Sequence, residues 1–411
     1  MSGFGKTILC LFCSALFWSA GAVECIVLPS FARNVDDQFV HILPNRPPMI
    51  PLVKEVAANE TFTVNVLFRN FRSEYDHADV FYRLVLKKPD GKEQVLCADL
   101  PGVPGIRKPP GSDVYLAGRL ARFAFTGEDQ PGKYRFIATA DDRIAKKQAA
   151  AEATVEYVRG RKAAPPLTEK ELDRFLMNDY LHPEPARLMD MIGLLLKQDM
   201  NLRKTKKNYS PLPMLYGFTV ILRDNPELTG AFASCISAAP PEQRGYAIPV
   251  FDLLGKDALE KAGNKLAPDL RKAVSDFDPK KNPLRFASPE TPVQLDMLWW
   301  DFFLTGKFEP ILKIAAALEL GKDGITPQAY KQLGAGATPA DRLRLRNKIM
   351  ELAAGWSLMS NARTHRLVFY YLEALAKRDG RLLPGEYART CVRAIVHTIE
   401  TAPQEKKPQA K

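Results

Sequence analysis

Apolar residues recur with two different periods along the chain, and the change of period divides it into two parts. Between residues 61 and 158 they alternate with polar residues, as Phe62, Val64, Val66 and Phe68 do, which is the pattern of a half-buried β-strand. From residue 168 onward they recur three or four positions apart, which is the pattern of helices that bury one face. The sequence therefore predicts a β domain followed by an all-α domain.

The densest apolar stretch is residues 293–320, in the second part. Thr291 is a helix N-cap, and apolar side chains then cover nearly the whole helix surface, so we expect Trp299 and Phe303 to be buried. Gly306 predicts a break, after which a second helical pattern follows. The stretch is therefore expected to form an antiparallel αα-hairpin.

Comparable helix pairs are predicted along the rest of this part. They cover residues 168–197, 213–237 and 338–399, with a capping box at Thr168 and Glu171 and an N-cap at Thr338. No fixed repeat period relates them. The α domain is therefore expected to be a solenoid-like or irregular bundle of αα-hairpins.

The first part is expected to be an antiparallel β structure. Strands are predicted at residues 38–42, 61–68, 80–86, 94–100, 114–125 and 153–158. Pro89-Asp90-Gly91 joins the third of these to the fourth as a tight turn.

One motif makes the fold more specific. Residues 129–136, DQPGKYRF, resemble the D-x-x-G-x-Y motif of immunoglobulin-like β-sandwiches. By that resemblance Tyr134 is the tyrosine-corner residue and Gly132 the tight-turn residue. Phe136 stands where antibody-type members have a cysteine, so their inter-sheet disulfide is not expected. The resemblance implies a fold and no activity.

The overall layout resembles uncharacterised exported bacterial proteins with a C-terminal helical domain. That resemblance depends on the order of the two parts and on the motif from Trp356-Ser357-Leu358 to Asn361 and His365. It likewise implies no activity.

The first 22 residues have the pattern of a secretory signal peptide. Lys6 precedes an apolar run, residues 8–18, and Ala20-Gly21-Ala22 is a small-residue cleavage site, so the mature chain is expected to start at Val23. An uncleaved anchor is the alternative, but the run is shorter than the roughly 20 residues that span a bilayer. We expect a periplasmic or secreted protein with a β domain at 23–160, a linker at 161–167, a helical domain at 168–400 and a polar tail at 401–411.

Four cysteines remain after such a cleavage: Cys25, Cys97, Cys235 and Cys391. In an oxidising compartment they can form disulfides, and Cys25–Cys97 and Cys235–Cys391 would each stay within one predicted domain. Four buried free thiols are the alternative.

The net charge of +11 favours anionic partners, either an envelope protein or an anionic envelope polymer. Nucleic acid is not expected in that compartment. The clearest basic cluster, residues 197–207, includes Lys204, Lys206 and Lys207 and is expected to be a solvated loop between two hairpins; contact with an anionic partner is the alternative.

The sequence predicts no catalytic, cofactor or metal site. The five histidines form no H-E-x-x-H motif, no G-x-S-x-G elbow is present, and the glycine patterns of phosphate and dinucleotide loops do not occur. Asp76-His77-Ala78-Asp79 offers possible cation ligands, although a solvated loop is the simpler interpretation.

Trp299, Trp300 and Asp301 combine aromatic rings with an acid, as carbohydrate sites often do. Two functions therefore stay open. The first is a non-catalytic binding or scaffold protein of the cell envelope. The alternative is a carbohydrate-active enzyme, a polysaccharide lyase or hydrolase, with its site on the helical domain.

Overall fold

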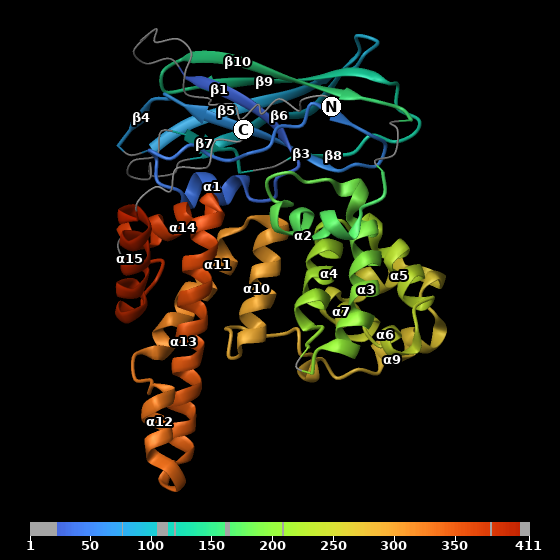
Figure 1. Ribbon diagram of the computed structural model, residues 1–411. Coiled ribbons are helices and arrows are strands. Elements are labelled where there is room, and N and C mark those ends of the chain that lie inside the picture. The colour runs from blue at the N-terminus through green and yellow to red at the C-terminus, as the bar shows by residue number, and fades with distance from the viewer. Residues whose placement is uncertain are drawn as a thin grey trace, which may run out of the picture. The chain divides into compact units, whose positions relative to one another are not determined.

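The computed structural model describes residues 23–75, 77–104, 114–118, 121–160, 165–207, 209–378 and 380–402. Strands fill the first part of the chain and helices the second (Figure 1). By packing, the chain divides into two compact units. Of the described residues, the β unit holds those up to Val40 together with Pro44–Met191, and the helical unit holds His41–Leu43 and those from Ile192 onward.

The β unit is built from two sheets. One has the order β1 (Glu24–Ser30), β3 (Phe62–Arg69), β7 (Val114–Leu116), with β8 (Ala121–Phe123) also paired to β3. The other has the order β2 (Glu55–Val56), β10 (Lys147–Tyr157), β9 (Gly132–Asp142), β5 (His77–Lys87), β4 (Ser73–Glu74), with β6 (Glu93–Pro104) also paired to β5, and it curls like half of a barrel.

The core of the β unit contains the alternating residues that predicted its strands. Phe62 and Phe136, from different sheets, meet edge to face with ring centroids 5.9 Å apart. Phe68 is fully buried, and its ring lies where a side chain at Gly102 would be, 2.5 Å from an ideal Cβ there. The strands expected around residues 61–68, 80–86 and 94–100 are confirmed, and the last two pair as a hairpin.

The start of β9 has the local geometry that the sequence motif implies. The Tyr134 hydroxyl donates a hydrogen bond of 2.8 Å to the carbonyl of Gln130, and Gly132 adopts a φ of 136° that side chains rarely allow. The buried tyrosine therefore ties the turn to the strand that follows it.

The strand predicted at residues 38–42 is wrong, because this segment belongs to α1 (Val35–His41). The backbone N–H of Gln38 donates to the carbonyl of Asn34 at 3.0 Å, and the buried Gln38 side chain accepts a 2.6 Å hydrogen bond from the backbone of Met49. A run this short is compatible with the periodicity of a strand or of a helix. Here it is helical, and the Gln38 side chain forms hydrogen bonds with the backbone of the loop at Met49.

The other regular elements are helices, joined by loops and short 3₁₀ turns. The β unit also contains α2 (Glu169–Asn178) and the start of α3 (Leu188–Thr205). The helical unit continues with α4 (Leu212–Asp224), α5 (Thr229–Ser237), α6 (Pro241–Arg244), α7 (Ala247–Leu254), α8 (Lys256–Ala262), α9 (Pro268–Ser275), α10 (Pro292–Thr305), α11 (Phe308–Ala317), α12 (Pro327–Leu333), α13 (Pro339–Thr364), α14 (Arg366–Lys377) and α15 (Glu386–Thr401). Among the described residues, no helix combines the length and the apolar character needed to cross a membrane.

Three helix starts and one helix end lie where capping residues predicted them. Thr168, Thr291 and Thr338 each form a capping box, and α10 ends at Gly306 in the left-handed conformation with a φ of 65°. These caps satisfy backbone groups that would otherwise have no partner at the first and last turns.

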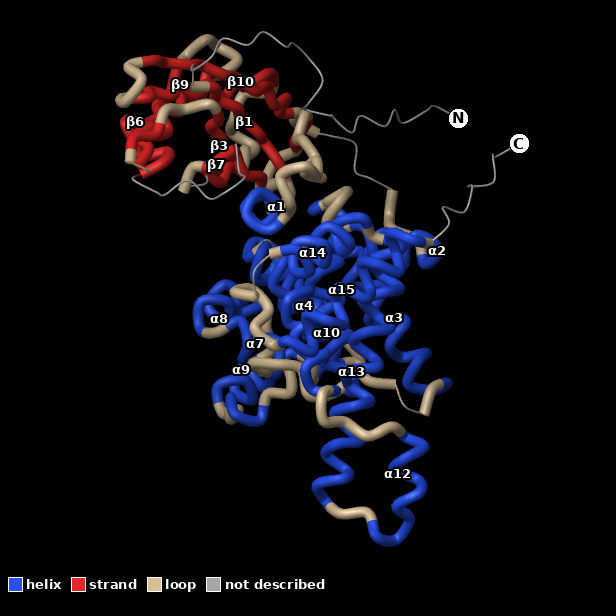
Figure 2. Tube along the Cα trace, turned by 90° about the vertical axis from the view of Figure 1, so that its left-hand side faces the viewer, coloured by secondary structure: helices blue, strands red, loops and turns tan. Residues whose placement is uncertain are grey.

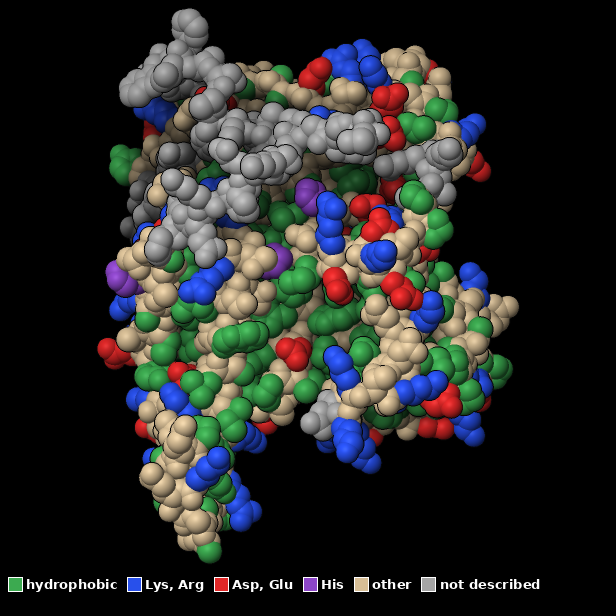
Figure 3. Space-filling model, in the orientation of Figure 1, with side chains coloured by type: hydrophobic (Ala, Val, Ile, Leu, Met, Phe, Trp, Pro, Cys, Tyr) green, Lys and Arg blue, Asp and Glu red, His purple; other side chains and the backbone are tan. Residues whose placement is uncertain are grey.

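The middle of the helical unit is the packing of α10 against α4 and α11. Trp299 is only 5% exposed and Phe303 only 9%, so their predicted burial is confirmed. Gly217 of α4 allows the close approach, because an ideal Cβ there would lie 2.3 Å from the Trp300 ring. On the face in Figure 3, hydrophobic side chains gather over this middle region, whereas Lys and Arg are dispersed.

The basic cluster at residues 197–207 is helical up to Thr205, so the predicted loop is wrong there. The helix continues because the fully buried Asp199 pairs with Arg203 one turn later, at 3.1 Å, and accepts hydrogen bonds from Gln243 and Tyr246, both at 2.8 Å. A buried carboxylate with three donors anchors this end of α3.

All four cysteines of the described chain are free thiols. Burial raises the pKa of the Cys25 thiol to about 12, which makes it unreactive at neutral pH. The structure thus has the free thiols that were the alternative to two disulfides.

Candidate functional site

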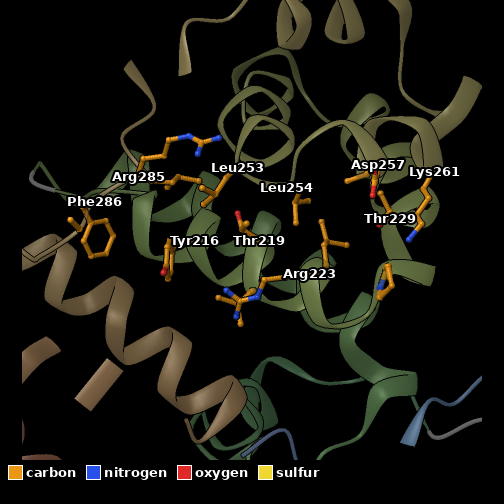
Figure 4. A pocket seen from close by; sticks show the side chains of 16 residues that line it. Tyr216, Thr219, Arg223, Thr229, Leu253, Leu254, Asp257, Lys261, Arg285 and Phe286 are labelled. Carbon is orange, nitrogen blue, oxygen red and sulfur yellow. The ribbon is translucent and has the colours of Figure 1, made fainter. Parts of the chain in front are cut away.

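A half-open cleft of about 800 Å³ lies within the helical unit (Figure 4). Its walls come from α4, α5, α7, α8, the short 3₁₀ turn Pro226–Leu228 and the segment 284–287. This volume is that of a small-molecule site rather than of a packing defect.

One helix supplies the floor of the cleft. Tyr216, Thr219, Val220 and Arg223 of α4 follow one another at helical spacing and therefore share a face. Leu253 and Leu254 line the cleft from the end of α7. The lining is thus apolar in the middle, with polar groups along one side.

The two ends of the cleft differ in chemistry. Figure 4 shows Phe286 and Arg285 at one end and Asp257 and Lys261 at the other. Near the first end, the rings of Tyr216 and Phe286 have centroids 5.7 Å apart. A ligand that fills the cleft would therefore meet aromatic rings and a guanidinium at one end, and an ammonium group beside a carboxylate at the other.

Arg285 is held in place by α7. Its Nε lies 3.1 Å from a carboxylate oxygen of Asp252, and one terminal nitrogen donates to the Asp252 carbonyl at 2.8 Å. Asn282 donates to the same carboxylate at 2.7 Å. Because a guanidinium has five N–H donors and its side chain is 45% exposed, Arg285 keeps donors for a ligand.

Arg223 joins the cleft to a group of charges behind it. Its guanidinium lies 3.3 Å from Asp224 and 3.8 Å from the buried Asp301 of α10. Lys307 lies 3.8 Å from Asp224. Burial lowers the pKa of Arg223, but attraction to Asp224 and Asp301 outweighs it and raises the pKa overall, so the cation is permanent.

The protonation of the neighbouring groups limits the chemistry available. Burial raises the pKa of the Tyr216 hydroxyl to about 12, and the charge of Asp301 adds to this shift. Tyr216 is therefore protonated at neutral pH and acts as a hydrogen-bond donor, not as a base. Burial also raises the pKa of Asp301, against the opposing effect of Arg223 and Lys307.

The structure separates the residues that the sequence proposed as ligand-binding. Trp299 is buried, Trp300 packs over Gly217, and Asp301 is 8% exposed behind Arg223, and none of them lines the cleft. Lys204 and Lys206 are exposed, and Lys204 is the last-turn residue of α3. Lys207 is exposed just beyond that helix, so the three lysines are also not part of the cleft.

Sequence reasoning did not find Leu253, Asp257, Lys261, Arg285 or Phe286. They come from residues 241–287, where no element was predicted because the helices are short. A signal was present, since α6 and α9 both begin with a proline in the first turn, a position that proline favours. What the sequence could not show is that this stretch folds against α4.

Acidic, histidine and cysteine side chains of the described chain form no group that could hold a metal ion. Asp76, one of the possible cation ligands in the sequence, lies outside the described residues. His365 is 3% exposed at the junction of α13 and α14, where its ring packs against Phe303 with centroids 5.1 Å apart. It is part of the helical core.

Comparison with known proteins gives no family for this chain. No model of a protein family matches it, and no curated protein matches it. One solved structure that a search finds is a family 123 glycoside hydrolase from Clostridium perfringens, described for the hydrolysis of glycolipid glycans. The match has 8% identity and a TM-score of 0.23, and it covers 43% of this chain and 36% of that enzyme. At that score neither a shared fold nor a shared activity is inferred.

Proposed function

We propose that the protein is a non-catalytic binding protein of the cell envelope, whose helical unit holds an anionic ligand in the cleft. The observation that carries the proposal is the lining itself. Three cationic side chains, Arg223, Lys261 and Arg285, line a half-open cleft, and Asp257 is the one acid among the described residues of its lining.

The chemistry of the lining favours a segment of an acidic glycan. The rings of Tyr216 and Phe286 offer apolar faces to a sugar, while the guanidinium of Arg285 offers paired donors to a carboxylate or phosphate. The distant Lys261 offers a second positive charge, so a ligand with acidic groups at intervals fits better than a single small anion.

Calorimetric titration with oligosaccharides of equal length tests this proposal. Uronic-acid or phosphorylated oligosaccharides should bind, and neutral glucose oligosaccharides should bind at least tenfold more weakly. Lys261→Gln should weaken the acidic ligand about tenfold, which corresponds to about 1.4 kcal/mol.

Lys256 provides a matched control. It is exposed on the same helix, α8, but does not line the cleft, so Lys256→Gln should leave affinity unchanged. Equal affinity for acidic and neutral ligands, or an equal loss in both variants, would contradict a specific anion site.

A carbohydrate-active enzyme is the second candidate, and one observation favours it. Asp301, a buried acid with a raised pKa, contacts Arg223 of the cleft and acts electrostatically on Tyr216. Such an acid could donate a proton if a sugar reached it. Incubation with acidic polysaccharides followed by analysis of chain length decides the matter: turnover that Asp301→Asn abolishes would favour the enzyme, and intact polymer favours the binding protein.

The proposal includes export and an immunoglobulin-like β unit. The support for export is the leader pattern in residues 1–22, and the support for the sandwich is the hydrogen bond from Tyr134 to Gln130 together with two sheets around one core. Mass spectrometry of the protein from the periplasm or medium should give a chain that begins at Val23. Retention of the leader in that material would contradict cleavage.

A further inference from the structure

The helix α13 has an apolar surface that no described residue covers. Met350, Ala354, Leu358 and Ala362 form its buried face. On the opposite face the exposed fractions are 42% for Ile349, 49% for Leu352 and 75% for Trp356. An exposed row of large apolar side chains on one helix indicates an interaction site rather than scattered surface residues.

The exposed residues have the spacing of a helix–helix seam. Leu345, Ile349, Leu352, Trp356 and Met359 alternate in steps of four and three, which places them at the a and d positions of successive heptads. We call these five residues the α13 seam. Leu345 and Met359 at its ends are partly exposed, so the whole seam is accessible along one side of the helix.

Arginines stand at both ends of the α13 seam. Arg342 lies three residues before Leu345, and Arg363 lies four residues after Met359, so both stand at the next heptad positions of the seam. Arg346 lies one turn after Arg342. All three are exposed, and none has an ion-pair partner among the described residues. The acid on this face, Asp341, lies one turn before Leu345 and is already engaged, because it caps the helix with Thr338 and pairs with Arg344 at 3.5 Å. Glu351 lies toward the packed side and pairs with Lys348 at 2.6 Å.

The placement of α13 leaves the seam open within its own unit. Figures 1 and 2 agree that α12 and the adjoining half of α13 extend beyond the other helices. The glycines Gly321 and Gly355 lie toward the packed side, close to Glu351 and Leu318 respectively. Packing within the unit therefore uses the face opposite the seam.

We propose that the α13 seam docks an amphipathic helix of a partner protein, with apolar a and d residues in its centre and carboxylates at both ends. The charges argue against a second copy of this chain, because antiparallel pairing would oppose Arg342 to Arg363 and parallel pairing would oppose each arginine to itself. The width argues against a bilayer surface, since a membrane-lying helix has a broad apolar face and the seam is one row wide. This surface is separate from the cleft, so the proposal does not depend on the ligand proposed there.

A labelled peptide of three heptads tests the proposal, with leucine at the central a and d positions and glutamate at the seam ends. Fluorescence anisotropy with the full chain should show saturable one-to-one binding. The same peptide with lysine at the seam ends should not bind measurably. Because arginines stand at both ends of the α13 seam, the acidic peptide fits in either direction.

Three variants make the test specific. Trp356→Ala should reduce the affinity at least tenfold, as a buried aromatic anchor of an interface does. The double change Arg342→Glu and Arg363→Glu should reverse the preference, so that the lysine peptide binds and the glutamate peptide does not. Leu343→Ala is the matched control: Leu343 lies on the same helix, 48% exposed but outside the seam, and its loss should leave binding unchanged.

Other occupants would overturn the proposal by distinct results. A dimer in sedimentation velocity that Trp356→Ala dissociates would assign the seam to a second copy. Sedimentation with phosphatidylglycerol vesicles that depends on Trp356 would assign it to a membrane. Equal binding of both peptides, or of neither, would exclude the charge-matched helix. Unchanged melting temperatures confirm that each variant folds.

Discussion

At the scale of single residues, Trp299 is a packing residue of the helical core. Its ring packs edge to face against Phe302, with centroids 6.0 Å apart, and stacks on Phe303 at 5.7 Å. The surface tryptophan, Trp356, is 75% exposed on another helix. Trp299 is thus buried and Trp356 exposed within the same unit. Replacing Trp299 should therefore change the free energy of unfolding much more than replacing Trp356.

Trp299→Ala should lower the free energy of unfolding by about 3 to 5 kcal/mol, because it removes a buried ring from a close-packed core. Trp299→Phe should lose less than about 1.5 kcal/mol, since it keeps most of the packing and removes an indole N–H that has no acceptor among the described residues. Urea unfolding measures both. Trp356→Ala, as the exposed control, should stay within about 0.5 kcal/mol of the parent, and an equally small effect of Trp299→Ala would refute the buried role.

At the scale of elements, the contact between α4 and α10 holds the cleft floor to the middle of the helical unit. The ring of Trp300 occupies the space beside Gly217, which neighbours Tyr216 of the cleft. Any side chain at position 217 must push the two helices apart or move the ring. The helix pair therefore couples the core to the position of the Tyr216 hydroxyl.

Gly217→Ala should cost about 1 to 3 kcal/mol of stability, because the added Cβ would lie 2.3 Å from the Trp300 ring. Gly193→Ala is the control on another helix, α3, where nothing lies within 4 Å of an ideal Cβ. That change should stabilise by about 0.5 to 1 kcal/mol through helix propensity alone. Thermal unfolding of the two variants should shift in opposite directions, and a stabilised Gly217→Ala would show that the close approach is not needed.

The sequence predicted helices and strands better than it predicted which of them pack together. Capping residues such as Thr291 and Thr338 act within one turn, so their signals can be read locally and the structure confirms them. The strand predicted at residues 38–42 was wrong because the Gln38 side chain bonds the backbone of Met49, eleven residues away, and a local pattern does not show such a contact. The cleft was missed for the same reason at a larger distance: Tyr216 and Arg285 are brought together by packing, and no local pattern records it.

At the scale of the whole molecule, a buried acid in the β unit should link the stability of that unit to pH. Asp179 of the β unit is fully buried, and burial raises the pKa of its carboxyl from 3.8 to about 7, against the attraction of Arg33. An acid whose pKa is higher in the folded state holds its proton there while the unfolded chain releases it. Between about pH 4 and pH 7 proton release therefore lowers the free energy of the unfolded state relative to the folded state. The free energy of unfolding falls as pH rises through this range.

Asp179→Asn should remove this pH dependence, which amounts to about 4 kcal/mol at most for a shift of about 3 units. The variant should match the parent at pH 4 and exceed it in stability at pH 8, when urea unfolding is followed by circular dichroism of the β signal. Tryptophan fluorescence is a second probe, because Trp299, Trp300 and Trp356 all belong to the helical unit. If only the circular dichroism transition moves, the two units unfold separately, and if both move, they unfold together. A parent protein whose β transition is equally stable at both pH values would contradict a protonated, buried Asp179.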